Sequence, residues 1–217
     1  MRTLTKTLLC CLLFCAAVVS VPASQSSLSL DELFRRARPV QASLKTLTAS
    51  FTETSVSTLL RQPVVATGTL VAAIPLRVVM QYEQPAPKTV AIDQRWMVLA
   101  WPGRAEIEKV NIAAIQSRVQ KYFVDVSPKQ LQESFVATLS QERSSEDVYR
   151  LDLVPKRKQI SEGVTRVQIW IHPGSLMMTK MTLSFAGGDA KTLELRDIKI
   201  NPRIDESAFA LLGRTGR

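Results

Sequence analysis

Residues 72–87 have the sequence AAIPLRVVMQYEQPAP, and this stretch decides the fold class. From Leu76 to Tyr82 every second side chain is large and apolar, and prolines stand before and after the run. This alternation is typical of a β-strand that buries one face, and prolines bound such a strand because they cannot donate hydrogen bonds to a sheet. The side chains on the face that we expect to be buried are Leu76, Val78, Met80 and Tyr82. That face covers either a packed core or a ligand, whereas Arg77 and Gln81 on the opposite face are expected to tolerate substitution.

The first 23 residues predict a signal peptide. Residues 1–6 carry two positive charges, and residues 7–21 are almost wholly apolar. A basic start, an apolar core of about 7–15 residues and a small-residue cleavage site are typical of a secretory signal. The alternative, a retained membrane anchor, needs roughly 20 apolar residues. We therefore expect cleavage near Ala23 and export of the remaining chain.

All three cysteines lie inside this predicted signal peptide, namely Cys10, Cys11 and Cys15. The exported chain would then have no thiol, which excludes a disulfide framework, a cysteine nucleophile and a thiolate metal site. Residues 24–212 are expected to form one domain that depends on its hydrophobic core alone. Residues 213–217 are expected to be a disordered tail.

The charge distribution argues against a nucleic-acid partner. The chain has a formal net charge of +9, and its densest basic cluster is Lys156-Arg157-Lys158. Nucleic-acid modules gather basic and aromatic side chains on one face, and the sequence shows no such stripe. We expect the basic cluster to lie in a solvated loop between strands. A positive surface still favours encounters with an anionic membrane or an acidic partner.

Hydrophobic periodicity predicts three helices and about ten strands. Spacings of three and four residues predict helices over 29–47, 111–123 and 127–135. Ser29 and Glu32 fit a capping box, and Pro39 is expected to kink or divide the first helix. The predicted strands are 48–60, 64–74, 76–83, 88–93, 95–101, 134–141, 147–154, 164–172, 176–185 and 190–200. Such runs of strands, with few helices between them, favour an antiparallel sheet rolled toward a barrel.

The search for catalytic residues favours a binding protein over an enzyme. His172 is the only histidine, so a histidine metal cluster or a relay of histidines is unavailable. It is followed by Pro173-Gly174 at the end of a predicted strand, a setting typical of a solvated turn. The sequence also lacks a Gly-x-Ser-x-Gly elbow and a glycine-rich phosphate loop. We therefore predict no catalytic residue, no metal site and no cofactor.

The region from Gly68 to Pro102 resembles the signature region of the periplasmic lipoprotein carrier family LolA, which has the LolA/LolB-like fold. That pattern is a glycine-led strand, a proline, a strand ending in aromatic–x–x–Pro, a strand running into Asp-Gly, and an apolar strand ending near proline. The matching residues are Gly68, Pro75, Tyr82, Pro85, Asp93 and Pro102. The segments LKTLTASFTET, YRLDLVP, VQIWIHPGSLMMTKMTLS and NPRIDESAFAL extend the resemblance over residues 30–211.

The resemblance implies a mainly β (α+β) fold: an open antiparallel half-barrel of about eleven strands, with an apolar concave face covered by two or three helices. Such proteins in Gram-negative bacteria take lipoproteins from an inner-membrane donor, shield their acyl chains and pass them to an outer-membrane acceptor. We expect a monomer with these transient partners. Met178 is further suitable lining, because thioether side chains repack around varied ligands. The side chains expected to line the cavity or its lid are Leu44, Leu70, Ile74, Leu76, Val78, Met80, Tyr82, Met97, Leu99, Ile112 and Ile115.

Two positions differ from the family pattern. Many members have an arginine before the matched proline, where it holds the lid by hydrogen bonds, and this chain has Ile74. The glycine that usually follows the matched aspartate is Gln94. Two alternatives therefore remain beside a lipoprotein carrier: a carrier of a glycolipid or lipid precursor in a dedicated export pathway, and a sensor of lipidated ligands on the same fold.

Overall fold

The computed structural model describes residues 28–123, 126–143 and 147–214, so the predicted signal peptide lies outside the described residues. Its helices are α1 (Leu30–Ser43), α2 (Ala113–Phe123), α3 (Pro128–Ser134) and α4 (Lys158–Ser161), with the 3-10 helices η1 (Ala186–Gly188) and η2 (Glu206–Gly213). Its strands are β1 (Thr46–Val56), β2 (Val64–Ala73), β3 (Arg77–Gln84), β4 (Lys88–Ile92), β5 (Trp96–Ala100), β6 (Ile107–Asn111), β7 (Phe135–Arg143), β8 (Asp147–Pro155), β9 (Arg166–Ile171), β10 (Met178–Ser184) and β11 (Ala190–Ile200).

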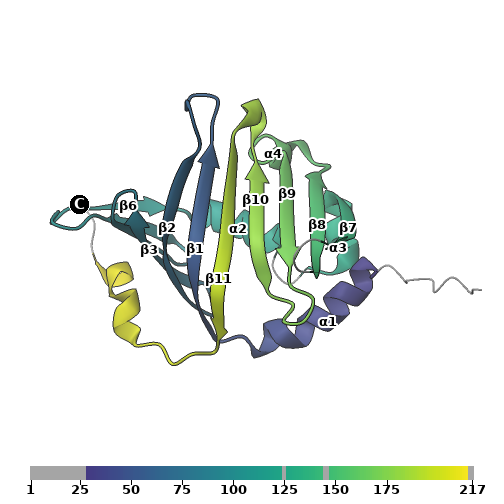
Figure 1. Cartoon of the computed structure of the whole chain (residues 1–217), viewed down its shortest axis with the longest axis horizontal. Helices are drawn as coiled ribbons and strands as arrows, with labels where there is room; N and C mark the ends of the chain where they lie inside the picture. Colours follow the sequence, from purple (N-terminus) through teal and green to yellow (C-terminus); the bar gives the residue numbers. More distant parts are fainter. Residues whose placement is uncertain (1–27, 124–125, 144–146, 215–217) are drawn as a thin grey trace, which may run out of the picture.

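The strands form one antiparallel, 11-stranded sheet in the order β6-β5-β4-β3-β2-β1-β11-β10-β9-β8-β7. The sheet is curved but does not close, since β6 and β7 are its two ends (Figure 1). The predicted open half-barrel of mainly β structure is confirmed. The sequence prediction missed β6, whose five residues contain only two large apolar side chains, Ile107 and Val110.

Local sequence explains where the helices begin. The Ser29 hydroxyl accepts a 3.1 Å hydrogen bond from the Glu32 N–H, so the predicted N-terminal cap of α1 is present. The carboxylate of Glu32 pairs with Arg35 instead of bonding back to the cap. Pro39 lies inside α1 without dividing it, and the helix ends at Ser43, four residues before the predicted end. A complete capping box, between Ser127 and Gln130, starts α3.

Helices cover the concave face of β7–β10. Leu30 of α1 and Leu131 of α3 pack there against Phe135 and Leu153, which are 0% and 1% exposed. Tyr122, near the end of α2, packs against the same cluster. We call strands β7–β10, with these helices, the helix-covered half.

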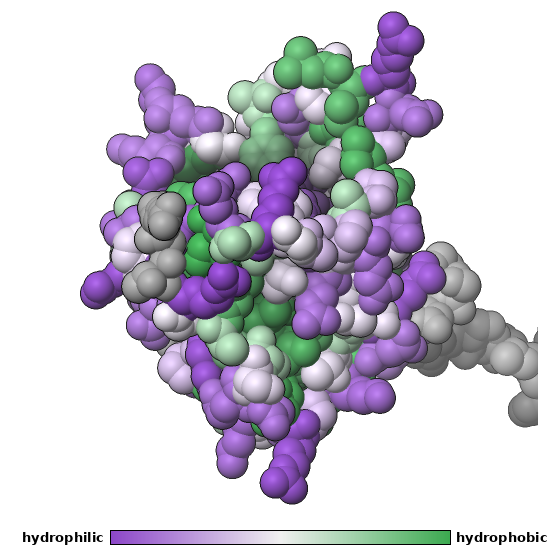
Figure 2. All heavy atoms as spheres, turned by 90° about the vertical axis from the view of Figure 1, so that its left-hand side faces the viewer, coloured by the Kyte–Doolittle hydropathy of each residue, from purple (hydrophilic) through white to green (hydrophobic). Residues whose placement is uncertain are grey.

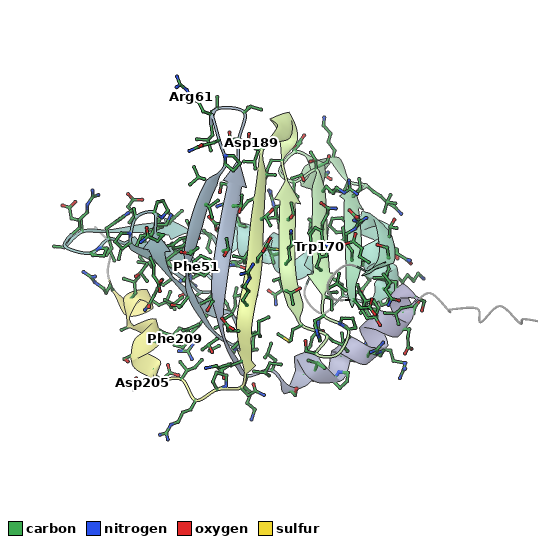
Figure 3. The ribbon with its side chains drawn as sticks, viewed as in Figure 1. Phe51, Arg61, Trp170, Asp189, Asp205 and Phe209 are labelled. Atoms are coloured by element: carbon green, nitrogen blue, oxygen red, sulfur yellow. The ribbon has the colours of Figure 1, made fainter. Side chains whose placement is uncertain are left out.

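The opposite, convex face of β2–β6 is covered by η2. Phe209 of η2, labelled in Figure 3, packs against Val79 of β3, which is 2% exposed. Arg77 donates two hydrogen bonds, of 2.6 and 3.1 Å, to the Glu206 carboxylate, and its guanidinium carbon lies 4.4 Å from the Phe209 ring centre. The prediction that this strand buries a single face is therefore wrong. Gln81 is exposed, whereas Arg77 takes part in a tertiary contact.

The last described residues, Gly213 and Arg214, lie next to this same region. Gly213 ends η2, and the Arg214 carbonyl accepts a 3.0 Å hydrogen bond from Lys109 Nζ. Arg214 also donates to the Ala105 carbonyl. Two of the five residues expected to form a disordered tail are thus placed by contacts, and residues 215–217 lie outside the described part of the chain.

Gly68 is required by the approach of two strands. The β2–β3 pairing shifts register between Thr67 and Gly68, which leaves an extra residue on β3. A Cβ at Gly68 would lie 1.9 Å from the Gln81 carbonyl oxygen and 3.0 Å from the Phe51 ring. A glycine in a strand commonly marks such a bulge or close backbone contact. The glycine that leads this strand in the sequence pattern therefore has a packing reason.

Candidate ligand-binding face

Strands β1–β5 and β11 present one continuous apolar surface on the concave side, which we call the open face. Its buried side chains come from strands that are distant in sequence. They are Leu47, Ala49, Phe51, Ala66, Leu70, Tyr82, Val90 and Leu195. Partly exposed apolar side chains extend the same surface: Leu44, Ala72, Val78, Met80, Ile92, Met97, Leu99, Met177, Met178, Leu193 and Ile198.

The open face lacks the helix packing found over β7–β10. Among the described residues, its cluster includes Leu44 at the C-terminal cap of α1 and no side chain of α2 or α3. Helix α2 lies behind the middle of the sheet (Figure 1), and it packs against α3. From Ala113 to Tyr122 no α2 side chain is buried, and Ile115 is 60% exposed. The open face is thus an apolar surface whose outer side chains remain accessible.

Seven of the eleven side chains predicted to line the site lie together on the open face. They are Leu44, Leu70, Val78, Met80, Tyr82, Met97 and Leu99. The cross-strand register explains the grouping, because Met80 lies opposite Leu70 on one side and Val90 on the other. Met97 and Leu99 follow from β5, which continues the same alternation.

The structure places the other four predicted residues elsewhere. Ile112 is buried just before α2, where its N–H donates to the Arg95 carbonyl at 2.8 Å. Ile115 projects from α2 and is mostly exposed. Ile74 is 57% exposed at the end of β2, and its N–H donates to the Lys45 carbonyl at 2.9 Å. Leu76 lies in the β2–β3 turn.

That turn borders a separate hollow of about 370 Å³. Its lining mixes apolar, aromatic and charged side chains: Pro75, Leu76, Arg77, Asp93, Gln94, Arg95 and Trp96. The Asp93 carboxylate already accepts hydrogen bonds from the N–H groups of Arg95 and Trp96, at 2.7 and 2.6 Å. Asp93 therefore serves to shape the β4–β5 turn, as an Asx turn does.

A cluster of three polar side chains, Glu53, Tyr82 and Lys191, lies at the end of the open face that is nearest the β1–β2 hairpin. The Tyr82 hydroxyl donates to Glu53 Oε2 at 3.0 Å, and Lys191 Nζ lies 3.2 Å from Glu53 Oε1. Phe51 meets the Tyr82 ring edge-on at 4.9 Å, and Lys88 Nζ lies 4.4 Å from the centre of that ring. Burial, and then the nearby Glu53 carboxylate, raise the pKa of Tyr82 well above its usual value. Tyr82 therefore stays a neutral hydrogen-bond donor.

Sequence reasoning missed more than half of the side chains on this surface, which come from β1 and β11 in particular. Leu47, Ala49 and Phe51 alternate clearly in β1, and that alternation could have identified them. In β11 an extra residue shifts the register between Ser50 and Thr48, and Asp197 has a positive φ of 52°. Alternation counted from Leu195 therefore fails to predict that Ile198 lies on the same face. A bulge of this kind reverses the apparent face of all later residues.

His172 lies in the β9–β10 turn, as its sequence context predicted. Its Nδ1 accepts hydrogen bonds from the N–H groups of Gly174 and Ser175, at 3.2 and 3.1 Å. The Ser175 hydroxyl lies 3.3 Å from the same nitrogen. Because Nδ1 is already an acceptor for the turn, these contacts give His172 a role in turn geometry. Within residues 28–123, 126–143 and 147–214 no cluster of three or more His, Cys, Asp or Glu side chains could hold a metal ion.

The open half-barrel with one accessible apolar face is consistent with the LolA-like carrier fold, whose members bind lipids or lipoproteins. The chain belongs to the LolA family, because the family model described as outer membrane lipoprotein carrier protein LolA matches residues 42–211. No curated protein matches the sequence. No helix in the described part of the chain is long and apolar enough to cross a membrane.

Solved structures share the fold at low sequence identity. The Mycobacterium tuberculosis lipoprotein LppX is 13% identical with a TM-score of 0.50, over 80% of this chain and 96% of that one. An uncharacterized conserved protein from Thermus thermophilus is 7% identical with a TM-score of 0.50, over 81% and 93% of the two chains. A LolA superfamily protein from Nitrosomonas europaea is 10% identical with a TM-score of 0.40, over 82% and 95%. At these identities the two comparisons with a TM-score of 0.50 show the fold alone.

Proposed function

We propose that the protein is a periplasmic carrier that shields the acyl chains of a lipoprotein or another lipid on its open face and moves them between the inner and outer membranes. The observation that carries this proposal is the contrast between the packed β7–β10 face and the accessible apolar face of β1–β5 and β11. Membership of the LolA family agrees with it.

The physical reason is the cost of exposing apolar surface to water. An acyl chain in water loses about 0.8 kcal/mol per CH₂ relative to an apolar environment. Side chains such as Val78, Met80 and Met97 are themselves only partly buried. A chain laid across them removes apolar surface of both partners from water, which favours binding. Because no helix packs over the open face in the described part of the protein, a bound acyl chain can also leave it.

Methionine suits such a surface. Met80, Met97, Met177 and Met178 all belong to the open face. Thioether side chains are flexible and polarizable, so they repack around ligands of different shape. The surface therefore favours a class of acylated ligands over one rigid molecule.

Position 74 is where many LolA-family members have an arginine that holds a lid over the ligand site. Ile74 lies where the end of β2 meets Lys45, just after α1, and its side chain has no hydrogen-bond donor. We propose that Ile74→Arg supplies a donor that reaches the carbonyls at this end of α1, and so slows release of a fluorescent fatty-acyl probe. Ile74→Leu is the matched control, and equal release rates for the two variants would contradict this part of the proposal.

The cargo is tested on the exported protein itself. Native mass spectrometry of protein from a periplasmic fraction is expected to show an added mass, and solvent extraction is expected to release an acylated molecule. The extract distinguishes a lipoprotein from a free lipid or glycolipid. Protein that is empty and also ignores a fluorescent fatty-acyl probe would refute the carrier function.

His172 provides the test against an enzyme. His172→Ala is expected to leave probe binding and cellular function intact, since its ring bonds only within the β9–β10 turn among the contacts described. Loss of function in a variant whose thermal unfolding is normal would reopen a catalytic role.

A further inference from the structure

The β1–β2 hairpin exposes apolar side chains that neither the sheet nor the open face uses. The hairpin and the neighbouring β10–β11 connection extend to the same end of the molecule (Figure 1), and the two leucines follow each other in the hairpin turn. Leu59 is 92% exposed and Leu60 is 43% exposed. The strand ends add Val56, Val64 and Val65, each at least 43% exposed. Figure 2 shows apolar surface at the top of the molecule, where this hairpin lies.

The turn holds these leucines in a defined position. The Leu60 N–H donates to the Ser57 carbonyl at 3.0 Å, and the Leu59 N–H lies 3.3 Å from the Ser57 hydroxyl. The Thr58 N–H donates to Asp189 Oδ1 at 3.1 Å, which ties the turn to the start of β11. The apolar tip is therefore a structured projection from the sheet, and its exposure is a property of the fold.

Basic side chains share this end of the sheet. Arg61 is in the tip itself, and Figure 3 shows it at the top of the hairpin, above Asp189. The register places the end of β1, the start of β11, the end of β10 and the start of β9 at the same end. Helix α4 precedes β9 there, with Arg157 and Lys158 of the basic cluster. The acids nearby are Asp189, which bonds Thr58, and Glu162, whose carboxylate is 3.9 Å from Lys158 Nζ.

We propose that the β1–β2 hairpin is a membrane-docking element that inserts Leu59 and Leu60 into the surface of an anionic lipid bilayer. Arg61, Arg157 and Lys158 then lie at the level of the headgroups. Exposed apolar side chains combined with flanking basic ones are the combination that binds anionic bilayer surfaces. A narrow projecting tip fits between lipids, whereas a protein partner usually meets a broader and flatter patch.

Docking through the hairpin would bring the open face to the membrane. Strand β1 runs directly from Val56 at the hairpin to Glu53 and Phe51 on the open face. An acyl chain leaving the bilayer beside the hairpin therefore meets the polar end of that face first. The docking itself does not depend on the proposed cargo, because it can be measured with protein that carries no ligand.

The test is flotation of the purified, exported protein with vesicles of phosphatidylcholine alone or mixed with phosphatidylglycerol. The double variant Leu59→Ser/Leu60→Ser is expected to lower partitioning into anionic vesicles by about tenfold or more, because both inserted side chains are lost. Arg61→Gln is expected to lower it by about fivefold on anionic vesicles, and to have no effect on neutral ones. High salt is expected to lower the partitioning of the wild-type protein into anionic vesicles, and to lower that of Arg61→Gln by a smaller factor.

A matched control uses two apolar side chains at the opposite end of the sheet. Ile74 follows the end of β2 and Ile200 ends β11, and they are 57% and 41% exposed. Ile74→Ser/Ile200→Ser is expected to float like the wild-type protein. All variants share one N-terminal sequence, so their differences report on the substituted sites. Binding of a fatty-acyl probe without vesicles is expected to be unchanged in the hairpin variants, which separates docking from the carrier function.

Three results would overturn the proposal. The first is wild-type protein that does not float with anionic vesicles. The second is a hairpin variant that floats as well as the wild type, or a control that loses as much as the hairpin variant. The third is a wild-type protein that floats only when the vesicles contain a membrane protein donor, with this flotation lost in the hairpin variant. That result would identify a protein as the partner of the hairpin.

Discussion

The two halves of the sheet are covered on opposite faces. In β7–β10 the helices α1 and α3 cover the concave face, and Phe135 and Leu153 are almost fully buried there. In β2–β6 the cover is η2 on the convex face, with Phe209 over Val79. Helices α1 and α3 thus shield the concave face of one half, and η2 shields the convex face of the other half.

In the described part of the chain each half therefore has an uncovered face, and these two faces differ chemically. The convex face of β7–β11 carries charged pairs, including Arg166 with Asp152 and Lys180 with Glu194. The concave face of β1–β5 and β11 is apolar. A charged uncovered face is stable in water, whereas an apolar one gains free energy from any partner that covers it. The difference teaches that the helices' position along the sheet, more than its curvature, selects the candidate site.

The largest effect is expected in the helix-covered half. Phe135→Ala removes a side chain that is 0% exposed beneath α3, and it is expected to cost about 3–5 kcal/mol of unfolding free energy. Urea unfolding followed by circular dichroism measures it. At temperatures where the variant is folded, probe binding is expected to remain, since the site is in the other half. Equal loss of binding and stability would show that the halves are one unit.

The open face is expected to respond in binding more than in stability. Met80→Glu places a charge where acyl chains are proposed to lie, so binding of a fluorescent fatty-acyl probe should fall by at least about thirtyfold. Because Met80 is only partly buried, thermal unfolding should change modestly. The control is Gln81→Glu, which puts the same charge on the exposed side of the same strand.

The gentler substitution Val78→Phe fills the surface without adding charge. It is expected to lower binding of the same fatty-acyl probe by a smaller factor than Met80→Glu does. If Met80→Glu and Val78→Phe simply unfold the protein, the open face is a packed core and the proposed site is elsewhere.

The charged convex face predicts a dependence of stability on pH. Asp152 is 6% exposed, and although burial raises its pKa, the Arg166 side chain at 2.6 Å and the further hydrogen bond from Gln168 lower the pKa below its ordinary value. Arg150 Nε also lies 3.0 Å from Asp152 Oδ2, without the geometry of a hydrogen bond. The ionised form is therefore the one that stabilises the fold.

Asp152→Asn is accordingly expected to cost about 1–2 kcal/mol near pH 7, because charged partners are left without their carboxylate. A lowered pKa means that this contribution is present above the unfolded value of about 3.9 and is lost as pH falls through the folded value. The difference between wild type and variant should shrink below about pH 4 in unfolding measurements. A difference that persists at about pH 2 would assign the effect to packing instead.

The smallest effect is expected where η2 meets β3. Arg77→Ala removes an exposed ion pair and a guanidinium–ring contact, together about 0.5–1.5 kcal/mol. Gln81→Ala, on the same face but exposed, should change stability by less than about 0.5 kcal/mol. Thermal unfolding of the two variants compares them directly. Identical values would show that the contact of Arg77 with η2 contributes nothing measurable.

Local patterns were sufficient for much of the fold. Alternation placed Val78, Met80 and Tyr82 on one face, and a serine before a proline marked the start of α3. These signals depend on neighbours within a few residues, so they are readable along the chain. The assignment of ten strands followed from the same signals, with the edge strand β6 missed.

The candidate site was only partly predictable. Ile74 and Ile115 have the same apolar character as Met80, yet the structure leaves them mostly exposed and apart from the open face. The bulges in β10 and β11 reverse the alternation, so the face on which Met181 or Ile198 lies cannot be counted from the preceding residues.

The sequence by itself determined that the chain alternates apolar side chains over many strands, has all its cysteines in an apolar N-terminal stretch, and carries the LolA pattern. Only the tertiary structure decided which of those apolar faces are covered. Arg77 meets Glu206, and Arg36 meets Tyr149, across separations of 129 and 113 residues. Contacts at such distances depend on where the whole sheet brings its ends, because burial is set by the final packing of all elements and not by the character of any one strand.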